Sequence, residues 1–167
     1  MAPIPLRDGD LRWVFPHLAE VEPVLDVLNT ATALVERLAA HLGHPRDDPD
    51  DPGGGLVFDH LPGAPYAGLT GTVRTEELTF ELRLSVPCDA RGRAVRPPPW
   101  LVDGEISIRC DAISDCGRHE LETLESECGT PTEAAGGVLA VAGWLLSRGT
   151  TVPPAGWRER DVLSRHR

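Results

Sequence analysis

The stretch ELTFELRLSVP, at residues 77–87, decides the fold of this chain because apolar and polar side chains alternate along it. The apolar positions are Leu78, Phe80, Leu82, Leu84 and Val86. Side chains of a β-strand point alternately to its two faces, so this pattern predicts a strand with one buried and one solvated face. Strands of a parallel sheet read as continuous apolar runs, and the sheet is therefore expected to be antiparallel.

Further strands are expected on the N-terminal side of this stretch. A short strand is predicted over residues 56–61, and a longer one over AGLTGTVR at residues 67–74. Thr75 and Glu76 are expected to form the turn of a hairpin with the deciding stretch.

A second hairpin is expected on the C-terminal side, with strands at about 104–113 and 118–126 around the turn SDCG. In the register that we infer, Arg109 lies opposite Glu122 as a pair of unlike charges. The same register puts Glu125 on the inward face of the sheet.

The segment EVEPVLDVLNTATALVERLAAHLG, at residues 20–43, carries apolar side chains at helical spacing and predicts an amphipathic helix. Pro23 suits the first turn, where its missing N–H has no partner to lose. Gly43 is expected to end the helix.

A second helix is predicted over TPTEAAGGVLAVAGWLLSRG, at residues 130–149. Thr130 and Glu133 match a capping box, Pro131 suits the first position, and Gly149 is expected to end the helix. Its side chains are apolar almost all round, which predicts a long helix buried on most sides, or one held by a partner on the side away from the sheet.

The order of these elements predicts an α+β fold with an N-terminal helix, an antiparallel β-meander of four to five strands and a long buried C-terminal helix. A length of 167 residues fits a single domain over 1–167. Within it we expect an irregular N-terminal arm at 1–19, an acidic Gly/Pro-rich loop at 44–55 and a basic C-terminal tail at 150–167.

The formal net charge of −10 makes nucleic acid and anionic membrane surfaces unfavourable partners, because both bind through accumulated positive charge. A basic protein partner is favoured instead. All sixteen basic residues are Arg, with no Lys or Gln, a bias typical of a high-G+C bacterial genome. No apolar run is long enough for a signal peptide or a membrane span, so a cytoplasmic location with reduced thiols is expected.

No catalytic residue is predicted. The chain has neither the Gly-x-Ser-x-Gly elbow of serine hydrolases nor the glycine fingerprint of a dinucleotide-binding fold. No cofactor is expected, and zinc is left open as an alternative because Cys116 and His119 have workable ligand spacing. The competing interpretation takes Cys110 and Cys128 as small buried apolar residues and Cys116 as a turn residue.

The run RHELETLESEC, at residues 118–128, allows two interpretations of Glu120, Glu122 and Glu127. Charged side chains commonly protect the edge of a sheet, and the same charges can form a docking surface for a basic segment, including the chain's own Arg-rich tail. Trp144, on the second helix, is a further candidate for an interaction surface.

We therefore expect a non-enzymatic protein-interaction module: an adaptor, a chaperone-like accessory protein or an inhibitor or immunity-type binder. The order of helix, meander and helix and the acidity are similar to those of small cytosolic secretion chaperones, which implies a homodimer or a stable complex with a basic protein. The alternative is a small-ligand-binding or cyclase-type protein with a pocket between the curved sheet and the C-terminal helix. Glu125, Thr123 and His119 would orient the ligand in that pocket.

Overall fold

The computed structural model describes residues 22–43, 56–60, 66–91, 93–95, 99–110 and 117–165. The predicted arm at 1–19, the acidic loop at 44–55 and Cys116 lie outside these residues. The described helices and strands are, in chain order, α2 (Glu22–Leu42), β1 (Leu56–His60), β2 (Tyr66–Arg74), β3 (Leu78–Pro87), β4 (Trp100–Arg109), β5 (Arg118–Cys128), α3 (Pro131–Thr151) and α4 (Pro154–Arg165).

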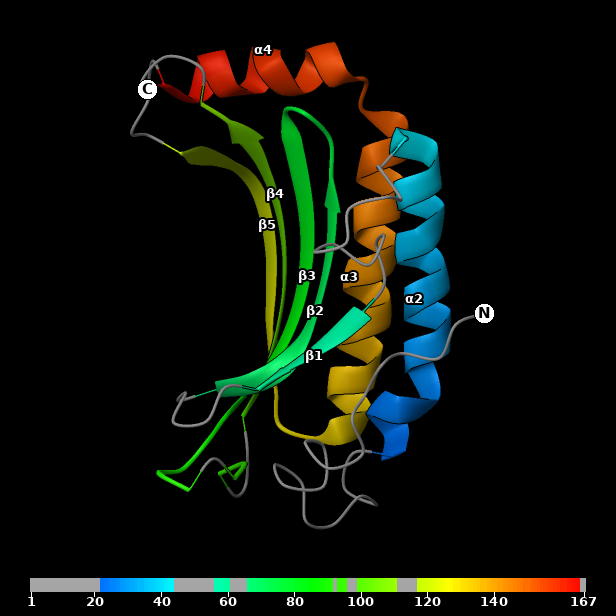
Figure 1. Cartoon of the computed structure of the whole chain (residues 1–167), viewed down its shortest axis with the longest axis vertical. Coiled ribbons are helices and arrows are strands. Elements are labelled where there is room, and N and C mark those ends of the chain that lie inside the picture. The colour runs from blue at the N-terminus through cyan, green and yellow to red at the C-terminus, as the bar shows by residue number, and fades with distance from the viewer. Residues whose placement is uncertain are drawn as a thin grey trace.

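The five described strands form one antiparallel sheet in the order β1-β2-β3-β4-β5, so each strand pairs with its neighbour in the sequence. Helices α2 and α3 lie side by side on one face of this sheet, and α4 crosses its end (Figure 1). The predicted α+β fold, with an N-terminal helix, an antiparallel meander and a buried C-terminal helix, is confirmed.

The alternation in the deciding stretch corresponds to the two faces of β3. Its apolar residues are at most 4% exposed and face the helices, together with the alternate residues Val102, Ile106 and Ile108 of β4. Leu, Val and Ala supply most of the core, and among the described side chains Phe80, Trp100 and Trp157 are the buried aromatic ones. Each buried aliphatic side chain contributes about 1.5–3 kcal/mol to folding.

The packing of α2 explains why the side chains of α3 are apolar on more than one side. One side of α3 packs on the sheet and another packs along α2, so the second cover comes from the same chain. Gly104 of β4 permits the approach on the sheet side, because a Cβ there would lie 2.6 Å from Val141 Cγ1. The side of α3 that carries Gly136 and Ala140 is exposed.

The predicted helix ends are partly confirmed. Gly43 has a φ of 67° after α2, and Thr130 forms the capping box of α3 with Glu133. The prediction that Gly149 ends the second helix is wrong: α3 continues to Thr151. Gly149 is buried instead, where a Cβ would lie 2.3 Å from the Leu38 side chain, so its size serves the packing of α3 on α2.

Three other sequence predictions need correction. Residues 150–167 are not simply a tail, because α4 spans Pro154–Arg165. The β2–β3 turn is formed by Glu76 and Glu77, since Thr75 N donates to Leu78 O at 2.8 Å. The register of the second hairpin also differs, and its cause is a β-bulge.

In the observed register Arg109 pairs with Arg118, and Glu122 pairs with Ile106. The predicted pair of Arg109 and Glu122 is therefore wrong. Strand β4 begins at Trp100 and ends at Arg109, earlier than the pattern indicated, so the connection to β5 is longer than a tight turn.

Candidate functional site

The β-bulge determines where the side chains of β5 point. Ile106 pairs with Glu122 and Ser107 pairs with Glu120, which leaves Leu121 as an extra residue on β5. A bulge reverses the alternation of faces beyond it. Leu121 packs against the core, and its neighbour Glu122 is also directed to the helix side.

Glu122 is the centre of a polar cluster between β5, α3 and α4. Arg148 Nε of α3 donates to Glu122 Oε2 at 2.7 Å, and Arg160 of α4 forms an ion pair with the same carboxylate. The two guanidinium groups also lie over the ring of buried Trp157, with Cζ 5.7 Å from the ring centroid for Arg148 and 5.1 Å for Arg160. One carboxylate of the acidic strand, Glu122, thus pairs with Arg160 of the chain's own C-terminal segment, and the two interpretations stay open for Glu120 and Glu127.

His119 belongs to the same region and is held by α4. Its Nδ1 lies 2.9 Å from Oδ1 of Asp161, which is buried. Within the described residues, no three side chains of His, Cys, Asp or Glu lie close enough to hold a metal ion. Cys116 lies outside these residues, so the zinc alternative stays a prediction. Cys110 and Cys128 are buried, at 9% and 4% exposed.

The sheet face opposite the helices carries an acidic network around Arg83 of β3. Arg83 Nε donates to Asp103 Oδ2 at 2.8 Å and Nη2 to Glu105 Oε2 at 3.0 Å, and Glu81 lies 3.5 Å away. Burial opposes the charge of Arg83, but the hydrogen bond to Asp103 and the three carboxylates outweigh it and raise the pKa of Arg83. Glu125 lies directly opposite Asp103, so this face carries more carboxylates than Arg83 can neutralise.

The residues proposed for a ligand pocket do not converge on the helix side of the sheet. Thr123 pairs with Glu105, and Glu125 pairs with Asp103. Thr123 and Glu125 therefore lie on the face of the sheet opposite the helices, the open face, and both are exposed. The inward position expected for Glu125 is wrong, because the bulge shifts the alternation of β5 by one residue and places the Glu125 side chain on the open face. His119 points to the helix side and contacts α4.

The residues proposed for an interaction surface also divide into two groups. Glu120 and Glu127 are exposed on β5, at the edge of the sheet. Glu122 lies in the cluster under α4, and Trp144 is half-buried, with its ring next to Gly104. Two of the four candidates are therefore accessible on the edge strand.

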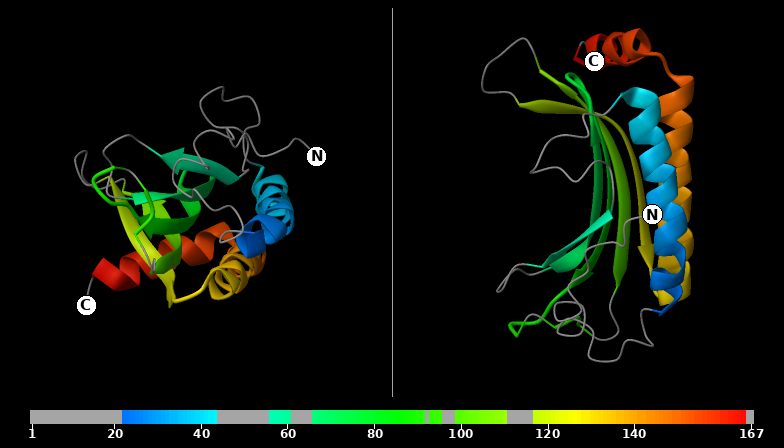
Figure 2. Two further views of the ribbon diagram at one scale, coloured as in Figure 1. Left: turned by 90° about the horizontal axis from the view of Figure 1, so that it is seen from below. Right: turned by 45° about the vertical axis from the view of Figure 1, so that its right-hand side comes forward.

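The open face lies on the concave side of the bent sheet. The end of the sheet near α4 curves away from α3, and Figure 2 shows the same bend from a second direction. In the described part of the chain no helix covers this face. Strand β5 forms one border of it, and no backbone hydrogen bond from another described segment reaches the outer edge of β5.

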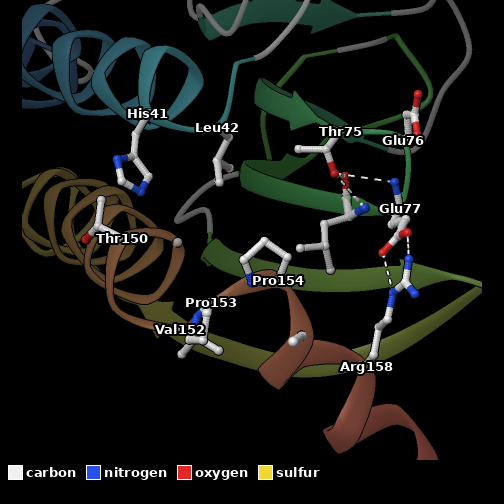
Figure 3. A pocket seen from close by; sticks show the side chains of 13 residues that line it. His41, Leu42, Thr75, Glu76, Glu77, Thr150, Val152, Pro153, Pro154 and Arg158 are labelled. Carbon is white, nitrogen blue, oxygen red and sulfur yellow. Dashed lines mark hydrogen bonds and ion pairs between the residues drawn. The ribbon is translucent and has the colours of Figure 1, made fainter.

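An open cleft of about 640 Å³ lies where the end of α2, the β2–β3 turn and the α3–α4 junction meet (Figure 3). Leu42, Leu78 and Val152 line it, and the ion pair between Glu77 and Arg158 stands at its rim. Its volume is in the range of small-molecule sites. Neither Glu125, Thr123 nor His119 is among the residues that line it.

Comparison with known proteins gives no match: no family model fits the chain, and no curated protein or solved structure is significantly similar to it. Among the helices that the structure describes, none combines the length and apolarity needed to cross a membrane.

Proposed function

We propose that this protein is a protein-interaction module that binds a basic, extended segment of a partner along β5 and the adjoining open face of the sheet. The observation that carries the proposal is the edge of β5. It is eleven residues long, it has exposed acidic side chains, and within the described chain its outer backbone edge is unpaired.

Backbone geometry explains why the partner segment is extended. An edge strand presents alternate N–H and C=O groups, and an added strand satisfies them with hydrogen bonds of its own. β5 is long enough to pair with a full strand of a partner, since strands commonly have about five or six residues.

Charge explains why the segment is basic. The exposed side chains of Glu120, Glu125 and Glu127 follow β5, and Asp103 and Glu105 stand beside them on β4. These carboxylates repel an acidic segment and a second copy of β5 alike. The chain supplies a parallel within the molecule, because Arg160 of α4 and Arg148 of α3 contact Glu122, the Glu of β5 that the bulge turned inward.

The test uses two short synthetic peptides of equal length, one alternating Arg with Val and the other alternating Glu with Val. We expect the Arg peptide to bind and to slow hydrogen exchange at the amides of β5, and the Glu peptide not to bind. The double variant Glu125→Arg/Glu127→Arg should abolish binding of the Arg peptide.

The matched control is Glu22→Arg/Glu36→Arg, which makes the same charge change at exposed positions of α2. It should bind the Arg peptide as the wild type does. If both double variants lost binding of the Arg peptide equally, the net charge of the protein would explain the binding, and the proposal would be contradicted. Slowed exchange in α2 or α3 without β5 would contradict it as well.

A second candidate function rests on the cleft in Figure 3, whose volume suits a small molecule and whose lining combines apolar residues with polar ones such as His41 and Thr75. A ligand there should shift the amide signals of Thr75 and Val152 in a screen of small metabolites. A screen in which only β5 amides respond would exclude the cleft in favour of the edge strand.

A further inference from the structure

Three arginines gather at one end of the open face, away from the carboxylates around Arg83. Arg109 at the end of β4 pairs directly with Arg118 at the start of β5. Arg74, at the end of β2, pairs with Thr79 of β3 in the adjacent part of the sheet. The three side chains belong to three different strands but to one corner of the same face.

The charges of this arginine corner are close enough to repel one another. Burial lowers the pKa of Arg118, and the positive charges of Arg74 and Arg109 lower it further, while Glu105 acts in the opposite direction. Like charges held together raise the energy of the folded chain, and the energy falls when a counter-charge arrives.

No carboxylate among the described side chains forms an ion pair with Arg109 or Arg118. The one hydrogen bond of the Arg118 side chain there is long, from Nη1 to the carbonyl oxygen of Glu77 at 3.4 Å. Glu105, the carboxylate that acts on Arg118, is bound by Arg83 at 3.0 Å. The network around Arg83 therefore engages Glu105, and Glu120, which lies opposite Ser107 on the same face, forms no ion pair with Arg109 or Arg118.

Two buried hydroxyl groups lie beside the three arginines. Thr79 of β3 pairs directly with Ser107 of β4 on the open face. Their side chains are nevertheless only 4% and 3% exposed. Thr79 Oγ1 has no hydrogen-bond partner among the described residues. A buried hydroxyl without a partner costs free energy, so its presence among positive charges indicates a ligand that accepts a hydrogen bond.

We infer that this corner is a binding site for a phosphate group, held by Arg74, Arg109 and Arg118 with Thr79 as a hydroxyl donor. Phosphate fits better than a carboxylate because its charge and its several acceptor oxygens can engage guanidinium groups from three directions. In a protein with a net charge of −10, bulk electrostatics repel anions, so phosphate binding has to come from a local site. The inference does not depend on the proposed partner segment.

The test is a titration of the full chain with inorganic phosphate at constant ionic strength, followed by the NMR signals of the arginine Nε–H groups. We expect a saturable shift of the Arg118 signal, and no comparable shift with acetate. Arg109→Gln should abolish the shift. The matched control Arg37→Gln removes the same charge from the exposed side of α2 and should leave it intact.

Thr79→Val separates binding from folding. Val has nearly the same shape as Thr and removes the unpartnered hydroxyl, so the variant should melt at a higher temperature than the wild type. It should nevertheless bind phosphate about threefold to tenfold more weakly, the loss expected for one hydrogen bond. A shift that does not saturate, that acetate reproduces, or that Arg37→Gln removes as fully as Arg109→Gln would overturn the inference.

The source of the phosphate is decided by a third arm with a phosphoserine peptide. Binding much tighter than that of inorganic phosphate would identify a phosphorylated protein segment as the ligand. Equal affinity would identify a free phosphate or a small phosphate ester, and both results support the site.

Discussion

Replacement of Trp157 by alanine should release α4 from the rest of the fold while the sheet and the other helices stay folded. Trp157 is 1% exposed and packs edge-on against Phe80, with the ring centroids 6.2 Å apart. Within residues 154–161 of α4, the only other buried residue is Asp161. Over residues 154–161 the helix is thus docked through one apolar side chain and a few polar contacts.

The magnitude follows from these contacts. Truncating a buried tryptophan to alanine costs about 3–5 kcal/mol. The remaining polar contacts of α4 include the ion pairs of Arg158 and Arg160, whose side chains are 62% and 43% exposed, and the contact between Asp161 and His119. Exposed ion pairs contribute about 1 kcal/mol or less each, and a hydrogen bond contributes about 0.5–1.5 kcal/mol net. A polar helix of twelve residues is marginal on its own in water. The loss therefore exceeds what the polar contacts retain, and α4 should unfold locally.

The assay is hydrogen exchange measured by mass spectrometry, with thermal melting alongside it. In Trp157→Ala, amides of α4 should exchange as in an unfolded chain, while α3 and β3 stay protected. The melting temperature should equal that of a chain truncated after Pro153, because both variants lack docked α4. Arg158→Gln, which removes only the ion pair with Glu77, should keep α4 protected.

Two results would refute this reasoning. Protection of α4 in Trp157→Ala would show that the polar contacts hold the helix without its anchor. A variant that melts well below the truncated chain would show that Trp157 stabilises the sheet and not only the docking of α4.

Three further predictions concern stability and can be measured by denaturant unfolding. Gly104→Ala should cost about 1–3 kcal/mol, because the added Cβ would meet Val141, whereas Gly136→Ala, in open space, should stabilise α3 by up to about 1 kcal/mol; equal effects would contradict the packing argument. Thr130→Ala should cost about 1 kcal/mol through loss of the capping box, and no change would mean that α3 does not depend on its cap. Arg83→Gln should cost about 1 kcal/mol at low salt and less at high salt, because it leaves carboxylates facing one another; a loss independent of salt would rule out charge as its cause.

Local sequence patterns were sufficient for the architecture. The alternation over residues 78–86 predicted the two faces of β3, and the helical spacing together with Gly43 and the capping box at Thr130 predicted α2 and the start of α3. Helix α4 was missed because five of its twelve residues are charged and its large apolar residues, Trp157, Val162 and Leu163, do not recur at helical spacing. Its docking depends on tertiary contacts that no local pattern contains.

The candidate site was less predictable because of a single extra residue. Strict alternation along β5 puts Leu121, Thr123 and Glu125 on one face, but the bulge at Leu121 turns Glu122 inward and Glu125 outward. The bulge does leave a trace in the sequence, because Leu121 and Leu124 are three residues apart and the acidic positions shift from 120 and 122 to 125 and 127. The arginine corner was missed for a related reason, since Arg74, Arg109 and Arg118 are far apart in the sequence and meet only through the register of the strands.

The strand order of the sheet also bears on how the chain folds. Because every strand pairs with its neighbour in the sequence, the whole sheet can form from hairpins that close short loops. The packing of α2 on α3 is different, since it joins the two ends of the meander and closes a loop that contains all five described strands. We expect the hairpins to form early and the helix pair to form late, so the sheet spends the interval with its apolar face uncovered. During synthesis α3 is made after all five described strands, so the sheet is complete before this part of its cover is available.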